Sequence, residues 1–321
     1  MSDPAAVPIG AGSPRDPWTN VYGVARTVLA LGTGSALLAD PADLLFRPLG
    51  LGIGDVVHDV ALLKLSLFAL LSGEWLGVAR WLAIGALAVV ASGWRPRVTG
   101  VLHWWISASF AGSSVIVEGG DQIVAVLTLL LIPVTLTDPR RWHWQAPHGR
   151  RTGAGAELTS LVARSALGVA RLQVAIVYFV SSTAKLSVPE WVNGTALYYW
   201  FLHPVFGLAQ PLRGWIVPAL GSPLLVTLAT WGVIAFEALL VSGLLMERRW
   251  RPQLLRLGLL FHLGIVVVHG LMSFFFAMAG ALVLYLRPVE ETFAFPDRLR
   301  ALAARIVWRA GRRLLAASRL A

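Results

Sequence analysis

The sequence contains no cysteine, and this absence excludes several kinds of chemistry. Disulfide bonds, thiolate metal sites and dithiol redox reactions all require cysteine side chains. Charged residues are also scarce, at 14% of the chain against about 25% in an average soluble domain. Because hydrophobic residues make up 56%, a soluble fold would expose large apolar patches, and disorder would require more charge. The composition therefore excludes a soluble globular enzyme and predicts an integral membrane protein.

Short catalytic motifs are missing as well. The sequence has no glycine-rich phosphate loop and no HExxH zinc motif. Two histidines at ligand spacing, His143 and His148, lie in an arginine-rich loop, where we expect them to be solvated, and we expect no metal. The N-terminal segment has acidic residues and prolines in place of a basic region followed by a short apolar core. We therefore do not expect a cleaved signal peptide.

Long apolar runs with few charges predict an all-α fold, a polytopic transmembrane helix bundle of about eight spans. The predicted spans are residues 19–39, 75–93, 98–116, 122–137, 167–186, 222–245, 253–269 and 271–287. The two longest connections, 40–74 and 187–221, are too apolar to be simple loops. They predict interfacial or re-entrant segments on the outer face.

The basic residues predict the orientation of the bundle. Only two of the 27 are lysines, Lys64 and Lys185, and the formal net charge is +10. Arginines follow the second, fourth, sixth and eighth predicted spans, whereas the other connections hold few of them. Because positive residues remain on the cytoplasmic side, we expect a multi-pass protein of the cell membrane with both termini in the cytoplasm. Arginines placed between apolar runs favour contact with anionic lipids and argue against nucleic acid as a partner.

Three parts of the chain follow from this pattern. They are a cytoplasmic N-terminal segment (1–18), a transmembrane domain (19–287) and a basic tail (288–321). In the tail, leucines fall on one side of a predicted helix and arginines on the other. A basic amphipathic helix of this kind lies on the inner leaflet of a membrane.

Polar side chains inside the predicted spans define the first candidate site. Glu237 lies about 22 Å along the sixth span, and His262 lies near the middle of the seventh. Gln173 adds a polar group to the inner half of the fifth span. Charged groups within a membrane are costly and are by default functional, with a partner. These residues either border a polar cavity between three spans or form a Glu–His pair that fastens two helices, and the sequence leaves both interpretations open.

Lys185 and Asp121 stand at the predicted outer ends of the fifth and fourth spans. As a base, Lys185 would have to be partly neutral near pH 7, which needs burial or a neighbouring positive charge such as Arg80. The alternatives are a snorkelling lysine or an ion pair with Glu190, which would keep the amine charged. Asp121 follows two glycines, where it can cap the helix, and Arg80 is a potential partner for it.

Several of these segments resemble the HTTM family, the membrane domain shared with the vitamin K-dependent gamma-carboxylase. The matching positions are Tyr178, Phe179, Lys185, Leu186, Trp191 and Gly194, with GGD at 119–121, FEALL at 236–240 and the segment 259–278. Within that family, residues 20–33 and 193–207 are most similar to the bacterial sporulation-delaying protein B group. That group works in producing an exported peptide toxin, so the resemblance implies a small partner protein and a peptide precursor as partners.

The resemblance also implies roles for the candidate residues. The carboxylase uses the matching lysine to deprotonate vitamin K hydroquinone, which implies that Lys185 is a catalytic base and that a quinone or quinol is the cofactor. Asp121, Glu237 and His262 would work with it in an outward-opening cavity. However, the carboxylase has a histidine near the GGD position and a large extramembrane domain, and this sequence has neither counterpart, so carboxylation of glutamate does not follow.

Three functions therefore stay open from the sequence. The chain is a maturation factor for a secreted peptide, a quinol-coupled membrane oxidoreductase, or a non-catalytic scaffold or immunity protein. Whether it is an enzyme is open for the same reason, because the residues indicate a site without its substrate.

Overall fold

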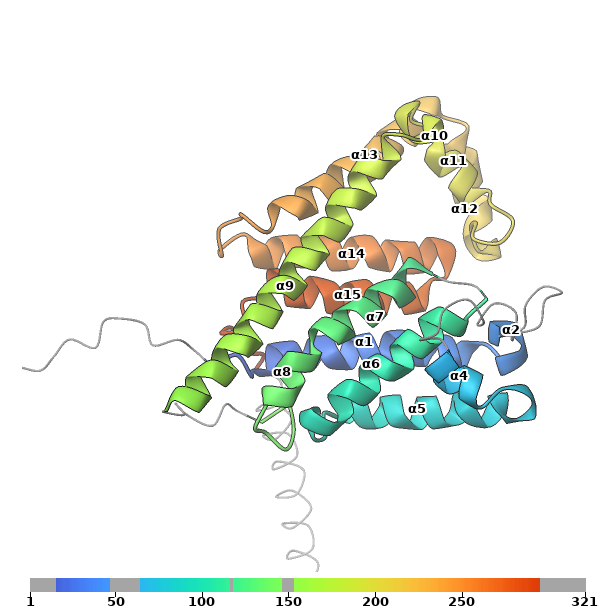
Figure 1. The fold of residues 1–321 in the computed structure, drawn as a ribbon. Helices are drawn as coiled ribbons and strands as arrows, with labels where there is room; N and C mark the ends of the chain where they lie inside the picture. The colour runs from blue at the N-terminus through green and yellow to red at the C-terminus, as the bar shows by residue number, and fades with distance from the viewer. Residues whose placement is uncertain (1–15, 47–63, 116–117, 146–152, 295–321) are drawn as a thin grey trace, which may run out of the picture.

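The computed structural model describes residues 16–46, 64–115, 118–145 and 153–294. Within these ranges the regular elements are helices, and one isolated β-bridge joins Trp94 to Trp142. The helices pack as one elongated bundle (Figure 1). The prediction of an all-α polytopic helix bundle is confirmed.

Eight helical segments coincide with the predicted spans. They are α1 (Asn20–Ala39), α5 (Leu76–Ser92), α6 (Pro96–Ser113), α7 and α8 together (Gly119–Leu130 and Ile132–Thr137), α9 (Ala154–Lys185), α13 (Pro223–Ser242), α14 (Arg251–His269) and α15 (Met272–Leu286). Six of these segments, all except α6 and α15, are long and apolar enough to cross a membrane. The chain is therefore a multi-pass membrane protein, and the exact number of spans depends on α6 and α15.

Helix α9 is longer than the sequence predicted. It starts at Ala154, whereas the predicted span starts at residue 167, and it runs for 32 residues. Glu157 and Arg164 interrupt the apolar run before residue 167, which is why the hydropathy pattern missed that part. Arg171 donates a hydrogen bond to the carbonyl of Tyr285 on α15, so packing between helices accommodates the charge.

The turn after α5 requires a glycine. Gly93 ends that helix in the left-handed conformation (φ +87°), which residues with a side chain rarely adopt. A Cβ at this position would lie 2.4 Å from the ring of His143. The loop that follows α8 therefore packs directly on the α5–α6 turn.

The structure corrects the prediction made for His143. We expected it to be solvated, but it is fully buried and approaches Thr27 of α1 to 3.3 Å. Burial lowers its pKa well below the usual value, and the nearby positive charges of Arg26 and Arg140 act in the same direction. The ring is therefore neutral and serves as packing, while His148 lies outside the described residues. In the described part of the chain, no three His, Cys, Asp or Glu side chains are grouped as metal ligands.

A buried ion pair holds the same loop to α1. Arg140 and Asp138 are both fully buried and pair at 2.8 Å, and the hydroxyl of Tyr22 donates to the same carboxylate. Burial alone would lower the pKa of Arg140, but hydrogen bonding to Asp138 and Tyr22 and the electrostatic attraction of both groups together outweigh burial and raise the pKa. Arg140 also donates to the carbonyls of His143 and Gln145. This end of the bundle is therefore held by a charged network in addition to apolar packing.

Helix α1 lies at the centre of the bundle. It packs along α15, and it also contacts α5 and α7 (Figure 1). Helices α9 and α13 pack on each other and run diagonally to α1, α5, α14 and α15 (Figure 1). Among the described residues, the largest group of buried apolar side chains spans α1, α7, α9, α14 and α15.

The long connection from α9 to α13 is mostly helical. It contains α10 (Pro189–Val192), α11 (Ala196–Phe201) and α12 (Gln210–Leu220). In Figure 1 these helices project from the ends of α9 and α13 and turn back toward the end of α14. The carbonyl of Phe206 contacts His269 there. Their place relative to a membrane stays a prediction.

The first long connection is described only in part. It contains α2 (Ala42–Phe46), α4 (Leu67–Leu70) and the 3₁₀ turn η2 (Gly73–Trp75), while residues 47–63 lie outside the described residues. The predicted amphipathic tail helix also lies outside them, from residue 295 onward.

The arginine-rich connections lie together. The α5–α6 turn, the loop after α8, the α13–α14 connection and the end of α15 are all at one end of the bundle (Figure 1). This arrangement is the one that the arginine pattern requires. The side of the membrane that this end faces stays a prediction.

Candidate functional site

An ion pair joins α9 to α13. The Nζ atom of Lys185, the last residue of α9, lies 2.7 Å from Oε2 of Glu237. Their side chains are only 18% and 10% exposed. Glu237 follows the start of α13 by 14 residues, or about 21 Å, so the pair lies within the apolar part of that helix. The partner of Lys185 is thus Glu237, and not Glu190 as we considered from the sequence.

Ser181 completes this cluster. Its hydroxyl donates to Oε2 of Glu237 at 3.1 Å and accepts a hydrogen bond from Nζ of Lys185 at 2.8 Å. Nζ also lies 5.1 Å from the centre of the Trp191 ring, a cation–π distance. Ser181 was not among the residues predicted from the sequence, although its spacing of four residues from Lys185 places the two on one face of α9. We call Lys185, Ser181 and Glu237 the serine–lysine–glutamate cluster.

His262 has a different partner from the one that we considered. It is buried, and its Nε2 lies 2.9 Å from the hydroxyl of Tyr178 on α9. The predicted Glu237–His262 pair therefore does not form. Tyr178 precedes Lys185 by seven residues, or two helical turns, so the two polar pairs follow the same face of α9. The Tyr178–His262 contact fastens α14 to α9.

Asp121 lies apart from this cluster. It caps the N-terminus of α7 through a reciprocal arrangement with Glu118 and lines a separate cavity of about 340 Å³ next to α1 and α2. Within the described residues, no hydrogen bond or ion pair joins Asp121 to Lys185. Arg80, considered as a partner for either residue, donates to the carbonyls of Leu37 and Leu38 at the end of α1.

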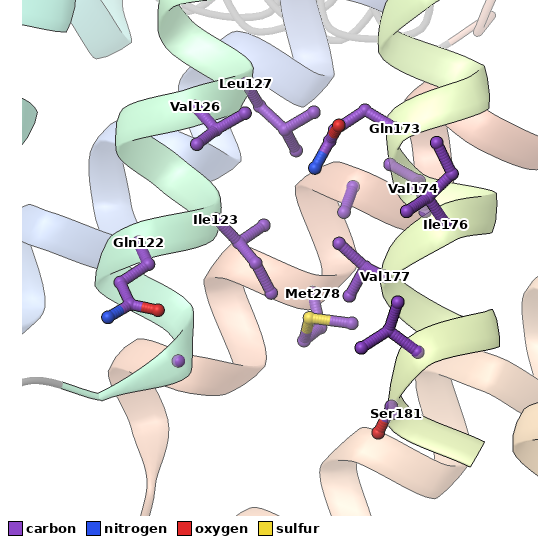
Figure 2. Close-up of a pocket in the computed structure, with 13 residues that line it drawn as sticks. Gln122, Ile123, Val126, Leu127, Gln173, Val174, Ile176, Val177, Ser181 and Met278 are labelled. Carbon is purple, nitrogen blue, oxygen red and sulfur yellow. The ribbon is translucent and has the colours of Figure 1, made fainter. Parts of the chain in front are cut away.

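Ser181 lines one end of a cavity of about 420 Å³. The cavity lies between α7, α9 and α15, and valine, isoleucine and leucine side chains form most of its wall (Figure 2). Its polar side chains are Gln122, Gln173 and Ser181. Figure 2 shows Gln173 and Ser181 at opposite ends of the cavity. The cavity has the volume typical of a ligand site, and one end touches the serine–lysine–glutamate cluster.

The HTTM domain family matches residues 157–289, which run from α9 to the end of α15. The chain is 39% identical over 285 residues to the uncharacterized protein YitO of Bacillus subtilis, covering 88% of this chain and 89% of YitO. It is also 35% identical over 276 residues to the sporulation-delaying protein SdpB of Bacillus subtilis, covering 86% of this chain and 84% of SdpB. The chain belongs to the HTTM family. It is an SdpB-like member, and no solved structure matches it.

The matched HTTM segment contains most of the candidate residues. Lys185, Ser181, Glu237 and His262 fall inside residues 157–289, and Asp121 falls outside. The region that the family model covers is therefore also the region that holds the two polar pairs of α9.

Proposed function

We propose that this SdpB-like HTTM protein acts in the maturation or export of a secreted peptide, and that the serine–lysine–glutamate cluster is its working site. The observation that carries the proposal is the 2.7 Å Lys185–Glu237 pair beside a cavity, inside the HTTM segment. The similarity to SdpB, a sporulation-delaying protein, supports the peptide role. A small partner protein and a peptide precursor are the partners that this role requires.

Holding two helices together with buried charged side chains costs more free energy than holding them with apolar ones. Apolar residues of similar volume usually stabilise a buried site as well as an ion pair does, or better. Charged side chains within membrane helices are accordingly concentrated at functional sites. The location of the Lys185–Glu237 pair 14 residues into α13 therefore supports a functional role over a purely structural one.

The ion pair also bears on the role of Lys185. The carboxylate of Glu237 lies 2.7 Å from the Lys185 amine, the geometry of an ion pair. To act as the base that the family resemblance implies, Lys185 would first have to transfer a proton to Glu237. The geometry favours Lys185 as a cation that holds Glu237 and Ser181 in place.

The test compares two substitutions at Lys185 in cells that produce the peptide precursor. Lys185→Ala removes the charge, whereas Lys185→Arg keeps it but cannot lose a proton. Lys64→Ala is the matched control, because Lys64 is the only other lysine and is exposed. We expect Lys185→Ala to abolish the mature peptide and Lys64→Ala to have no effect.

The outcomes separate the alternatives, provided that each variant accumulates in the membrane. If Lys185→Arg keeps maturation, Lys185 acts as a cation. If maturation is lost in both variants, Lys185 acts as a base. Normal maturation in Lys185→Ala would refute Lys185 as part of the working site. Normal maturation after deletion of the whole gene would refute the proposed function.

A quinol-coupled oxidoreductase is the second candidate, because the apolar cavity beside Ser181 suits an isoprenoid chain. A quinol, when bound, supplies reducing equivalents, and Gln173 and Ser181 are the polar side chains at the two ends of that cavity. Solvent extraction of the purified protein tests this candidate. Quinone that copurifies with the protein, and is lost when Val177→Trp fills the cavity, would favour it over peptide maturation.

A further inference from the structure

The hydroxyl of Ser181 behaves differently from its neighbours on α9. Ser182 and Thr183 both donate to the carbonyl of Phe179, as serine and threonine commonly do within helices. In the described part of the chain, Ser181 instead donates across to Glu237 on another helix. Ser181 is half-buried and is one of the residues that line the 420 Å³ cavity.

The groups around this oxygen suit a nucleophile. A serine hydroxyl becomes nucleophilic when an adjacent group accepts its proton, and the carboxylate of Glu237 lies 3.1 Å away. The ammonium of Lys185, at 2.8 Å, is placed to stabilise the negative charge that develops on the oxygen. Serine sites that lack the usual histidine, such as serine–lysine pairs, occur on unrelated folds.

We propose that Ser181 is the nucleophile of an acyl-transfer reaction that cleaves a peptide bond in the secreted peptide's precursor. This inference rests on the proposed function and specifies its chemistry. Glu237 acts as the general base, and Lys185 is a positioning and charge-stabilising residue.

The reaction balances without any further reagent except water. The Ser181 oxygen forms a bond to the carbonyl carbon of the substrate while its proton passes to Glu237. The carbon–nitrogen bond then breaks, and the departing amine takes the proton from Glu237, which leaves an acyl ester on Ser181. Water next attacks the ester and gives a proton to Glu237. The new carboxyl product leaves as the proton returns to the Ser181 oxygen.

The cavity favours a peptide as the acyl donor. Gln122 and Gln173 line its apolar wall, and neither side chain has a hydrogen-bond partner among the described residues. A lipid chain offers nothing for such amides to bind, whereas backbone groups of a peptide need partners inside a membrane. Gln173 precedes Ser181 by eight residues, or about 12 Å along α9. That distance corresponds to between three and four residues of an extended chain, at about 3.3 Å each.

The first test uses the full-length protein, purified in detergent or nanodiscs, and a long-chain alkyl fluorophosphonate, which labels activated serines covalently. We expect a single adduct on Ser181 by mass spectrometry, absent in Ser181→Ala and kept in the matched control Ser182→Ala. Glu237→Gln should slow the labelling by about 10²-fold, the usual contribution of a general base. Unlabelled wild-type protein, or equal labelling of wild type and Ser181→Ala, would overturn the proposal.

A second variant covers the case in which Ser181→Ala does not accumulate. Because the chain has no cysteine, Ser181→Cys and Ser182→Cys each introduce a single thiol. We expect Lys185→Met to slow the alkylation of the S181C thiol by N-ethylmaleimide about tenfold but not that of the S182C thiol, because the Lys185 ammonium favours the thiolate at position 181. An unchanged rate for the S181C thiol in Lys185→Met would contradict the proposal.

The third test separates this inference from the proposed function. In cells that carry the precursor, loss of mature peptide with Ser181→Ala but not with Ser182→Ala supports both. If gene deletion blocks maturation and Ser181→Ala does not, the proposed function stands and the nucleophile is refuted. If deletion leaves maturation intact while Ser181 is still labelled, the proposed function fails and the nucleophile stands. Release of fatty acid from phosphatidylglycerol vesicles without cleavage of the precursor would refute a peptide substrate.

Discussion

The Lys185–Glu237 pair should produce a large coupling free energy in a double-mutant cycle. Glu237→Gln keeps the shape of the side chain but leaves the Lys185 ammonium without its carboxylate. Breaking a buried pair costs about 3–5 kcal/mol, whereas an exposed pair contributes about 0–1 kcal/mol. With the side chains 18% and 10% exposed, the pair lies near the buried limit, so we expect each single substitution to cost about 2–4 kcal/mol.

The double variant Lys185→Met with Glu237→Gln provides the decisive comparison. It removes both charges together, so its cost should fall short of the sum of the two single costs by about 2 kcal/mol. The free energy of unfolding is measured on the full chain in one detergent or bicelle system. Glu247→Gln is the control, because Glu247 pairs with Arg249 at 2.8 Å with both side chains about two-thirds exposed (67% and 70%).

The two glutamate substitutions should differ in their cost to stability. We expect Glu247→Gln to cost less than about 1 kcal/mol, and added salt to reduce that cost further. Equal costs for Glu237→Gln and Glu247→Gln would refute the claim that the Lys185–Glu237 pair is effectively buried. So would a coupling free energy near zero.

Three further predictions concern the rest of the chain. Asp138→Asn should lower the stability by about 3–5 kcal/mol because it leaves buried Arg140 unpaired, and thermal unfolding that matches wild type would contradict this. Reporter fusions after residues 145 and 250 should be cytoplasmic and one near residue 205 external, and an external signal at residue 145 would overturn the topology. A synthetic peptide of the basic tail should bind phosphatidylglycerol vesicles and dissociate as salt rises, since each arginine contributes on the order of 1 kcal/mol near the surface; binding independent of salt would indicate that the leucines dominate.

The sequence predicted the helices well where the signal is local. Helix α1 starts and ends within one residue of the predicted 19–39, and α15 lies within the predicted 271–287. The membrane requires a spanning helix to be apolar whichever helix packs beside it. Such a span can therefore be recognised from the local sequence alone. Residues 154–166 of α9 were missed because Glu157 and Arg164 interrupt the apolar run there.

The sequence singled out individual polar residues as candidates but did not predict which of them pair with each other. Lys185, Glu237 and His262 stand out because each is a polar group in an apolar segment. Their partners depend on how α9 and α13 are aligned lengthwise against each other. No short-range sequence pattern encodes that alignment. Ser181 was not among the residues predicted from the sequence, because only the carboxylate beside it in the structure distinguishes it from the neighbouring hydroxyl residues.

The central contact of the bundle joins two helices that lie far apart in the sequence. Helix α1 packs along α15, so closely that a Cβ added at Gly280 would lie 2.8 Å from Leu29. During synthesis, α1 is made long before α15 and must wait in the membrane until α15 is inserted. The described part of the bundle therefore closes only after α15 has been made. A product that stops before residue 272 would present the unfilled face of α1 to lipid and to the quality-control proteases of the membrane, so truncated forms should be degraded and should not persist as partial bundles.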